Sequence, residues 1–168
     1  MTIWTLMAKL SSNASNPFAT ALRLLTRRDR SEAELRQKLQ QFGFCTSAID
    51  ETINKCREYN YLDDQRYAKE RARSFMRNGR GVGQKIRQDL RRRGINEALT
   101  EQAIENAEAE FSSDQILRDQ LSRRFPSFHY ARADDRERRR VISFFQRRGF
   151  PLEQIFAIVK SQNAPPPV

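Results

Sequence analysis

A glycine that recurs three times within the same apolar pattern constrains the fold more than any other feature of the sequence. Gly43, Gly94 and Gly149 are separated by 51 and 55 residues. An apolar residue stands four positions before, one position after and ten positions after each glycine: Leu39, Phe44 and Ile53; Leu90, Ile95 and Ile104; Phe145, Phe150 and Val159. A glycine that follows a helical apolar stripe suits the left-handed cap of a helix C-terminus. The recurrence therefore predicts a tandem array of helical units.

The stretch 62–94 shows one unit in detail. Asp63 and Asp64 can accept hydrogen bonds from free backbone N–H groups, so a helix is expected to begin there and to run to about Arg77. A second helix is expected to end at Gly94. Its apolar seam consists of Val82, Ile86 and Leu90, and the third helix has the apolar residues Leu99, Ala103, Ile104 and Ala107.

The flanking units show the same order of three helices. In the first, Ser31 and Glu34 form a capping-box pattern. Its second helix is expected to bury Leu35, Leu39 and Phe42, and its third helix Ile49, Ile53 and Cys56. In the last unit, the first helix is expected to contain Ile116, Leu117 and Leu121, the second to have Val141, Ile142, Phe144 and Phe145 on one side, and the third to contain Ile155, Phe156 and Val159.

These patterns predict an all-α protein of three tandem three-helix repeats. The expected organisation is a flexible leader (1–16), repeat 1 (17–61), repeat 2 (62–111), repeat 3 (112–161) and a disordered proline-bearing tail (162–168). A unit of this size buries too little apolar surface to be secure alone, so neighbouring repeats are expected to share a core. Hydrophobic residues make up only 38% of the chain, which favours an elongated array. The alternative is a single irregular helical bundle in which the glycines coincide by chance.

The chain is strongly basic, with a net charge of +10, which predicts attraction to a polyanion or to an acidic protein surface. The excess is concentrated in residues 77–93 and 132–148, which carry net charges of +6 and +4 and enclose the second helices of repeats 2 and 3. The candidate binding face consists of Arg77, Arg80, Lys85, Arg87, Arg91, Arg92, Arg136, Arg139, Arg140 and Arg147. Arginine side chains grip phosphates or carboxylates with paired hydrogen bonds. The alternative is that these residues are merely solvated helix flanks.

An acidic stretch balances this face, since residues 97–114 hold six acidic residues and no basic one. They are expected to pair with the adjacent basic helices, or else to contact a basic surface of a partner.

Catalytic and cofactor sites are not indicated. The loop with Gly79, Gly81, Gly83 and Lys85 lacks the spacing, the Ser or Thr and the preceding strand of a phosphate-binding loop. A contact between its backbone and a nucleic-acid phosphate is the weaker functional alternative for this loop. His129 has no partner in motif spacing, and Cys45 and Cys56 form neither a metal pattern nor a disulfide framework. We therefore expect a protein without enzymatic activity, metal or cofactor. No segment is long and apolar enough to cross a membrane, so a cytoplasmic location is expected.

Three segments resemble the RecX family of recombination regulators: residues 30–44, with the pattern Arg-Ser-Glu-x-Glu-Leu-x-x-Lys-Leu leading to Gly-Phe; residues 61–68, with Tyr-Leu-Asp-Asp-x-Arg-Tyr-Ala; and residues 83–95, which end in Arg-Gly-Ile. The resemblance implies three tandem three-helix repeats in a curved, elongated molecule. It also implies binding to the RecA recombinase and lodging in the groove of the RecA filament on single-stranded DNA. Filament growth, ATP hydrolysis, strand exchange and repressor cleavage would thereby be restrained.

On this hypothesis the protein is a monomeric, non-catalytic wedge whose basic helices dock against filament acids and DNA phosphates. Two other classes remain open. A helix-turn-helix transcription factor would prefer one duplex site far above random DNA. A helical adaptor for another protein would depend on neither DNA nor RecA.

Overall fold

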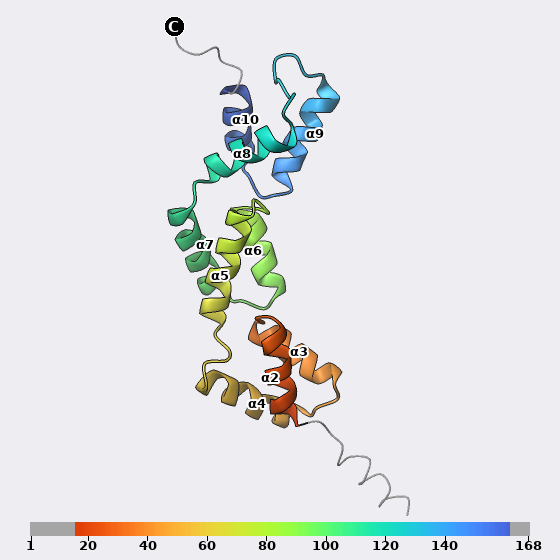
Figure 1. The fold of residues 1–168 in the computed structure, drawn as a ribbon, viewed down its shortest axis with the longest axis vertical. Coiled ribbons are helices and arrows are strands. Elements are labelled where there is room, and N and C mark those ends of the chain that lie inside the picture. Colours follow the sequence, from red (N-terminus) through yellow and green to blue (C-terminus); the bar gives the residue numbers. More distant parts are fainter. Residues whose placement is uncertain (1–15, 162–168) are drawn as a thin grey trace, which may run out of the picture. The chain divides into compact units, whose positions relative to one another are not determined.

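The structure is a computed structural model that describes residues 16–161, so the expected tail and all but the last residue of the expected leader lie outside the described residues. Over this range the chain forms nine α-helices and no strand (Figure 1). The helices are α2 (Pro17–Arg27), α3 (Glu32–Gln41), α4 (Thr46–Glu58), α5 (Asp64–Arg77), α6 (Gly83–Arg92), α7 (Glu97–Glu110), α8 (Ser113–Arg124), α9 (Asp135–Gln146) and α10 (Leu152–Ser161). The predicted all-α class and the three groups of three helices are confirmed.

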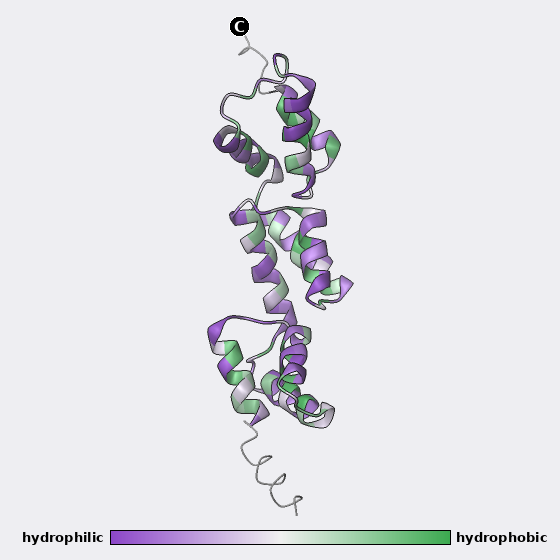
Figure 2. Cartoon of the chain, turned by 90° about the vertical axis from the view of Figure 1, so that its right-hand side faces the viewer, coloured by the Kyte–Doolittle hydropathy of each residue, from purple (hydrophilic) through white to green (hydrophobic). Residues whose placement is uncertain are grey.

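The helices are amphipathic, and Figure 2 shows apolar and polar residues alternating along them. The chain divides into two compact units after Asp64, and each is described by itself.

The first unit contains α2, α3 and α4 around its own small core. The core residues are Ala21, Leu24, Leu35, Leu39, Ile49, Ile53, Cys56 and Leu62. The expected capping box is present, since the Ser31 hydroxyl accepts from the Glu34 amide at 3.2 Å. Asp64 adds a second contact at the start of α3, where its Oδ1 accepts from the Glu32 amide at 2.9 Å. The expectation that Phe42 is buried is wrong: its side chain is 54% exposed, because α3 has already ended at Gln41 and Phe42 follows it as the cap.

The second unit contains α5 to α10, and repeats 2 and 3 share one continuous core. Buried side chains from all six helices belong to this cluster, including Phe75 of α5, Leu90 of α6, Leu117 of α8 and Phe145 of α9. The expectation that neighbouring repeats share apolar surface is therefore met for this pair.

The three recurring glycines end the second helix of each repeat in the same way. Gly43, Gly94 and Gly149 have φ angles of +84°, +74° and +88°, in the left-handed region. In each turn the glycine amide bonds a carbonyl three residues back, and the following amide bonds a carbonyl five residues back, as in Phe150 N to Phe145 O at 3.3 Å. This is the hydrogen-bond pattern of a Schellman cap. In repeat 3 the residue after the glycine, Phe150, packs on Phe145, with ring centroids 5.7 Å apart.

Gly149 also forms the joint between repeats 2 and 3. The amide of Val82, just before α6, donates to the carbonyl of Arg148 at 2.9 Å. A Cβ atom at Gly149 would lie 2.5 Å from the Val82 carbonyl oxygen and 2.7 Å from the Lys85 amide nitrogen. The backbone of the α9–α10 turn therefore approaches the start of α6 as closely as only a glycine allows.

Candidate functional site

The predicted basic residues of α6 are partly neutralised inside repeat 2. Arg87 makes a two-pronged ion pair with Glu101 of α7, with Nε and Nη2 each 2.6 Å from a carboxylate oxygen. Hydrogen bonding to Glu101 raises the pKa of Arg87 and lowers that of the Glu101 carboxyl. Arg87 is therefore occupied by its own chain, although part of its side chain remains accessible.

Asp89 is a structurally important residue that the sequence analysis did not identify. It lies on the inner side of α6 with 5% exposure and accepts from Arg71 Nε at 2.9 Å and from Arg93 Nε at 2.8 Å. Arg92, a predicted site residue, approaches it at 3.5 Å. Burial works to raise the pKa of Asp89, but the hydrogen bonds from Arg71 and Arg93 outweigh it and hold the pKa below its usual value. The signal in the sequence was a lone acid, one residue before the seam residue Leu90, in an otherwise basic helix.

Other predicted cations of repeat 2 remain available. Arg77, Arg80 and Arg91 are exposed and form no ion pair with any residue between 16 and 161. Lys85 is half-buried against the α9–α10 turn and is less accessible.

Arg87 and Arg91 line one small hollow of about 330 Å³ together with Ile95, Glu97 and Thr100. The Thr100 hydroxyl is buried there without a hydrogen-bond partner among the described residues. The structure thus brings these two predicted residues together.

In repeat 3, the predicted residues lie along α9 and at its C-cap. Arg136 and Arg139 occupy its first turns, and Arg147 caps its end. Eleven residues of α-helix span roughly 16 Å, so Arg136 and Arg147 cannot grip the same group. Arg140 lies between them, with its Cζ 5.9 Å from the ring centroid of Phe125.

Two further arginines, which sequence reasoning did not select, join Arg140 and Arg147. Arg148 stacks its guanidinium 3.5 Å above the ring of Phe144, which in turn meets Phe125 edge-on at 5.1 Å. Arg124 immediately precedes Phe125 and acts electrostatically on Arg148, as does Arg147. We name the set Arg124, Phe125, Arg140, Phe144, Arg147 and Arg148 the arginine–phenylalanine cluster.

The acidic stretch on α7 is only partly used for internal pairing. Glu101 binds Arg87, and Glu110 binds Arg73 of α5 with oxygen–nitrogen distances of 2.7 and 2.8 Å. Glu105 and Glu108 make no ion pair with the described part of the chain. Pairing thus accounts for two of the six acids, and a contact with a basic partner stays a prediction for the others.

The glycine loop between α5 and α6 packs against repeat 3. Gly79 has φ +60° and caps α5, and a Cβ atom there would lie 2.1 Å from the Gln120 side chain of α8. A Cβ atom at Gly81 would lie 2.8 Å from the Arg148 carbonyl oxygen. Both glycines are buried, so contacts within the protein account for this loop.

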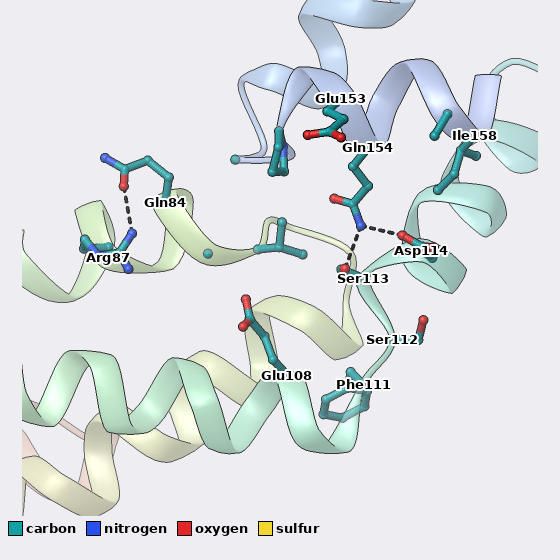
Figure 3. Close-up of a pocket in the computed structure, with 15 residues that line it drawn as sticks. Gln84, Arg87, Glu108, Phe111, Ser112, Ser113, Asp114, Glu153, Gln154 and Ile158 are labelled. Atoms are coloured by element: carbon teal, nitrogen blue, oxygen red, sulfur yellow. Dashed lines mark hydrogen bonds between the residues drawn. The ribbon is translucent and has the colours of Figure 1, made fainter. Parts of the chain in front are cut away.

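A hollow of about 1010 Å³ lies between repeats 2 and 3, where α6, α8 and α10 begin and α7 ends (Figure 3). Figure 3 shows Gln154 reaching from α10 to the start of α8, where its Nε2 donates to Ser113 Oγ at 2.7 Å and to Asp114 Oδ1 at 2.6 Å. Besides Asp114, the charged residues that line this hollow are Arg87, Glu108 and Glu153. The lining residues come from both repeats, so this hollow is part of the joint between them.

Between residues 16 and 161, no group of three or more His, Cys, Asp or Glu side chains is arranged to hold a metal ion. Within the same range no helix combines the length and apolarity needed to span a bilayer. Cys56 is buried in the first unit, and desolvation raises the pKa of its thiol, whereas Cys45 is exposed.

Comparison with known proteins decides the family. Models of the first, second and third three-helix domains of RecX match residues 18–56, 63–104 and 111–159. The chain belongs to the RecX family of regulatory proteins. The resemblance noted from three sequence segments is thereby confirmed.

Relatives and solved RecX structures agree with this assignment. The chain is 44% identical to the regulatory protein RecX of Syntrophotalea carbinolica, over 84% of this chain and 93% of the relative. It is 37% identical to that of Trichlorobacter lovleyi, over 86% and 94%. The crystal structure of RecX from Lactobacillus salivarius superposes with a TM-score of 0.68 at 21% identity, over 90% of this chain and 97% of that one. Another RecX crystal structure gives a TM-score of 0.70 at 20% identity, over 96% and 78%. At these identities the two structures support the fold alone.

Proposed function

We propose that this RecX family member binds the RecA recombinase and the RecA filament on single-stranded DNA, and that it restrains the filament without catalysis. Filament growth, ATP hydrolysis, strand exchange and repressor cleavage would all be lowered. We further propose that it acts as a monomer in the cytoplasm, in the groove of the filament. Membership of the RecX family supports the proposed partner and the proposed restrained activities.

One observation carries the mechanism. The second unit holds cations that its own carboxylates leave unpaired, namely Arg77, Arg80 and Arg91 in repeat 2 together with the arginine–phenylalanine cluster in repeat 3. Unpaired guanidinium groups can form paired, charge-assisted hydrogen bonds with carboxylates of a protein filament or with DNA phosphates. Arg87 and Arg92 contribute less, because Glu101 and Asp89 already engage them.

The test is co-sedimentation with RecA filaments, with and without single-stranded DNA, together with RecA ATPase assays. We expect the wild type to co-sediment and to inhibit, and the charge reversals Arg80→Glu and Arg91→Glu together to lower inhibition at least about tenfold. Both side chains are exposed and unpaired, so helicity should not change.

The matched control reverses Arg23 and Arg27, which are exposed on α2 of repeat 1 and make no ion pair with described residues. Full inhibition by the Arg80→Glu, Arg91→Glu variant would contradict the proposed role of these arginines. A wild type that ignores RecA but selects one duplex sequence would support the transcription-factor alternative instead.

A further inference from the structure

Arg148 is a charged residue whose position the fold itself does not explain. It is half-buried, and its Nε atom is buried with no hydrogen-bond partner in the described structure. Desolvation lowers the pKa of its guanidinium, and the nearby charges of Arg124 and Arg147 lower it further. No carboxylate compensates it, in contrast to Arg71, Arg73, Arg87 and Arg93 of repeat 2. A buried, unpaired donor beside like charges is costly.

The side chain is nevertheless held in one place. Its Nη1 donates to the Phe144 carbonyl at 3.2 Å, and its guanidinium lies over the Phe144 ring. Its own carbonyl accepts from the Val82 amide across the repeat joint. The guanidinium of Arg148 is therefore held in place although it forms no ion pair within the described structure.

The rest of the arginine–phenylalanine cluster surrounds this cation. Arg124, Arg140 and Arg147 are exposed, and none makes an ion pair with a residue of the described range. Arg124 and Arg147 lie at the C-terminal ends of α8 and α9, where partial negative charge of the helix dipole favours cations, and Arg140 lies in the middle of α9. Arg140 and Arg148 thus lie over the partly exposed rings of Phe125 and Phe144, and Arg124 and Arg147 are close enough to Arg148 to act on its charge.

We propose that the arginine–phenylalanine cluster is a binding site for the phosphodiester backbone of a nucleic-acid strand. An anion between Arg124, Arg147 and Arg148 supplies the missing counter-charge. Arg140 and the cap residue Arg147 are seven positions apart, about 10 Å along α9, a length that successive phosphates of one strand can occupy. The partly exposed faces of Phe125 and Phe144 suit the bases beside such a backbone. This site deepens the proposed function. It rests on that function only for its biological context, because the direct binding of a nucleic-acid strand to this chain does not require RecA.

The test is fluorescence anisotropy of a labelled oligodeoxythymidylate titrated with the full chain, without RecA, at several salt concentrations. The double variant Arg124→Ala, Arg147→Ala is expected to bind at least about tenfold more weakly than wild type. Each phosphate contact to a single strand contributes about 0.7 to the slope of log K against log salt, so losing two contacts should flatten the slope by about 1.4. The control Arg23→Ala, Arg27→Ala removes the same charge from repeat 1 and should bind within about twofold of wild type with an unchanged slope.

Other outcomes overturn the site. Equal weakening by both double variants would mean that net charge alone attracts the strand. Competition by polyglutamate as effective as that by unlabelled oligonucleotide would assign the cluster to acidic protein surfaces. A wild type that does not bind the oligonucleotide, yet still inhibits RecA, would remove this inference and leave the proposed function standing. Arg124 and Arg147 are exposed, and circular dichroism of each variant verifies that the helices are intact.

Discussion

At the scale of single residues, the availability of an arginine for binding depends on which side chains lie opposite it. Arg87 and Arg91 belong to the same basic helix, but Arg87 is bound to Glu101 whereas Arg91 has no ion-pair partner in the described range. Asp89 is the strongest case, because one buried carboxylate holds Arg71 and Arg93 from two different elements. Such a carboxylate fixes the spacing of α5 and α6.

Removing this carboxylate should destabilise the second unit. We expect Asp89→Asn to lower the free energy of unfolding by about 2 to 3 kcal/mol, because Arg71 and Arg93 would remain without a full counter-charge. This figure is below that for a fully buried pair, since both arginine side chains are more than 20% exposed. Urea denaturation measures the change. The control Asp50→Asn removes an exposed partner of Arg36 and should cost less than about 1 kcal/mol.

The effect should also depend on pH in a definite direction. The pKa of Asp89 is lower in the folded protein than its usual value of 3.8, so the charged form is favoured by folding. Its stabilising contribution is therefore present above that value and is lost as the pH falls through the folded pKa. The stability difference between wild type and Asp89→Asn should shrink below pH 3.8; a constant difference would contradict the ion-pair explanation.

At the scale of elements, each repeat ends its second helix with the same glycine cap, but the caps have different neighbours. A Cβ atom at Gly43 meets nothing within 4 Å, whereas one at Gly149 meets the backbone of α6. The turn in repeat 1 thus needs glycine for its φ angle alone. The turn in repeat 3 needs it for the φ angle and for close approach.

This difference gives a matched pair of substitutions. Gly43→Ala should cost about 1 to 2 kcal/mol, the strain of a left-handed conformation. Gly149→Ala should cost about 3 to 5 kcal/mol, because the new methyl group also forces the repeats apart. Hydrogen exchange provides a specific readout, since the Val82 amide is bonded to Arg148 across the joint and should lose protection only in Gly149→Ala. Equal costs for the two substitutions would mean that the joint relaxes freely.

At the scale of the whole molecule, the two units differ both in their hydrophobic cores and in their net charge. Residues 16–64 hold eight basic and eight acidic side chains around a core of their own, whereas residues 65–161 hold 22 basic and 13 acidic side chains around one core shared by two repeats. Affinity for a polyanion is therefore expected to reside in the second unit.

The shared core predicts how the repeats unfold. Leu117→Ala, at a fully buried position of α8, should cost about 2 to 5 kcal/mol and increase hydrogen exchange in both repeat 2 and repeat 3. Leu35→Ala, equally buried in the first unit, should increase exchange in residues 16–64 only. If Leu117→Ala affected repeat 3 alone, the core would not be cooperative across the joint.

The sequence by itself determined the helices, their three-fold recurrence and the left-handed turns at Gly43, Gly94 and Gly149, because apolar spacing and capping chemistry are local properties of the chain. It also placed most of the candidate basic residues on the second helices. Only the tertiary structure decided which of those charges are free, because pairing depends on what lies opposite. Glu101 and Asp89 engage Arg87 and Arg92, while Arg148 is held without a counter-charge. The close approach at Gly149 likewise follows from packing between elements, which no local pattern records.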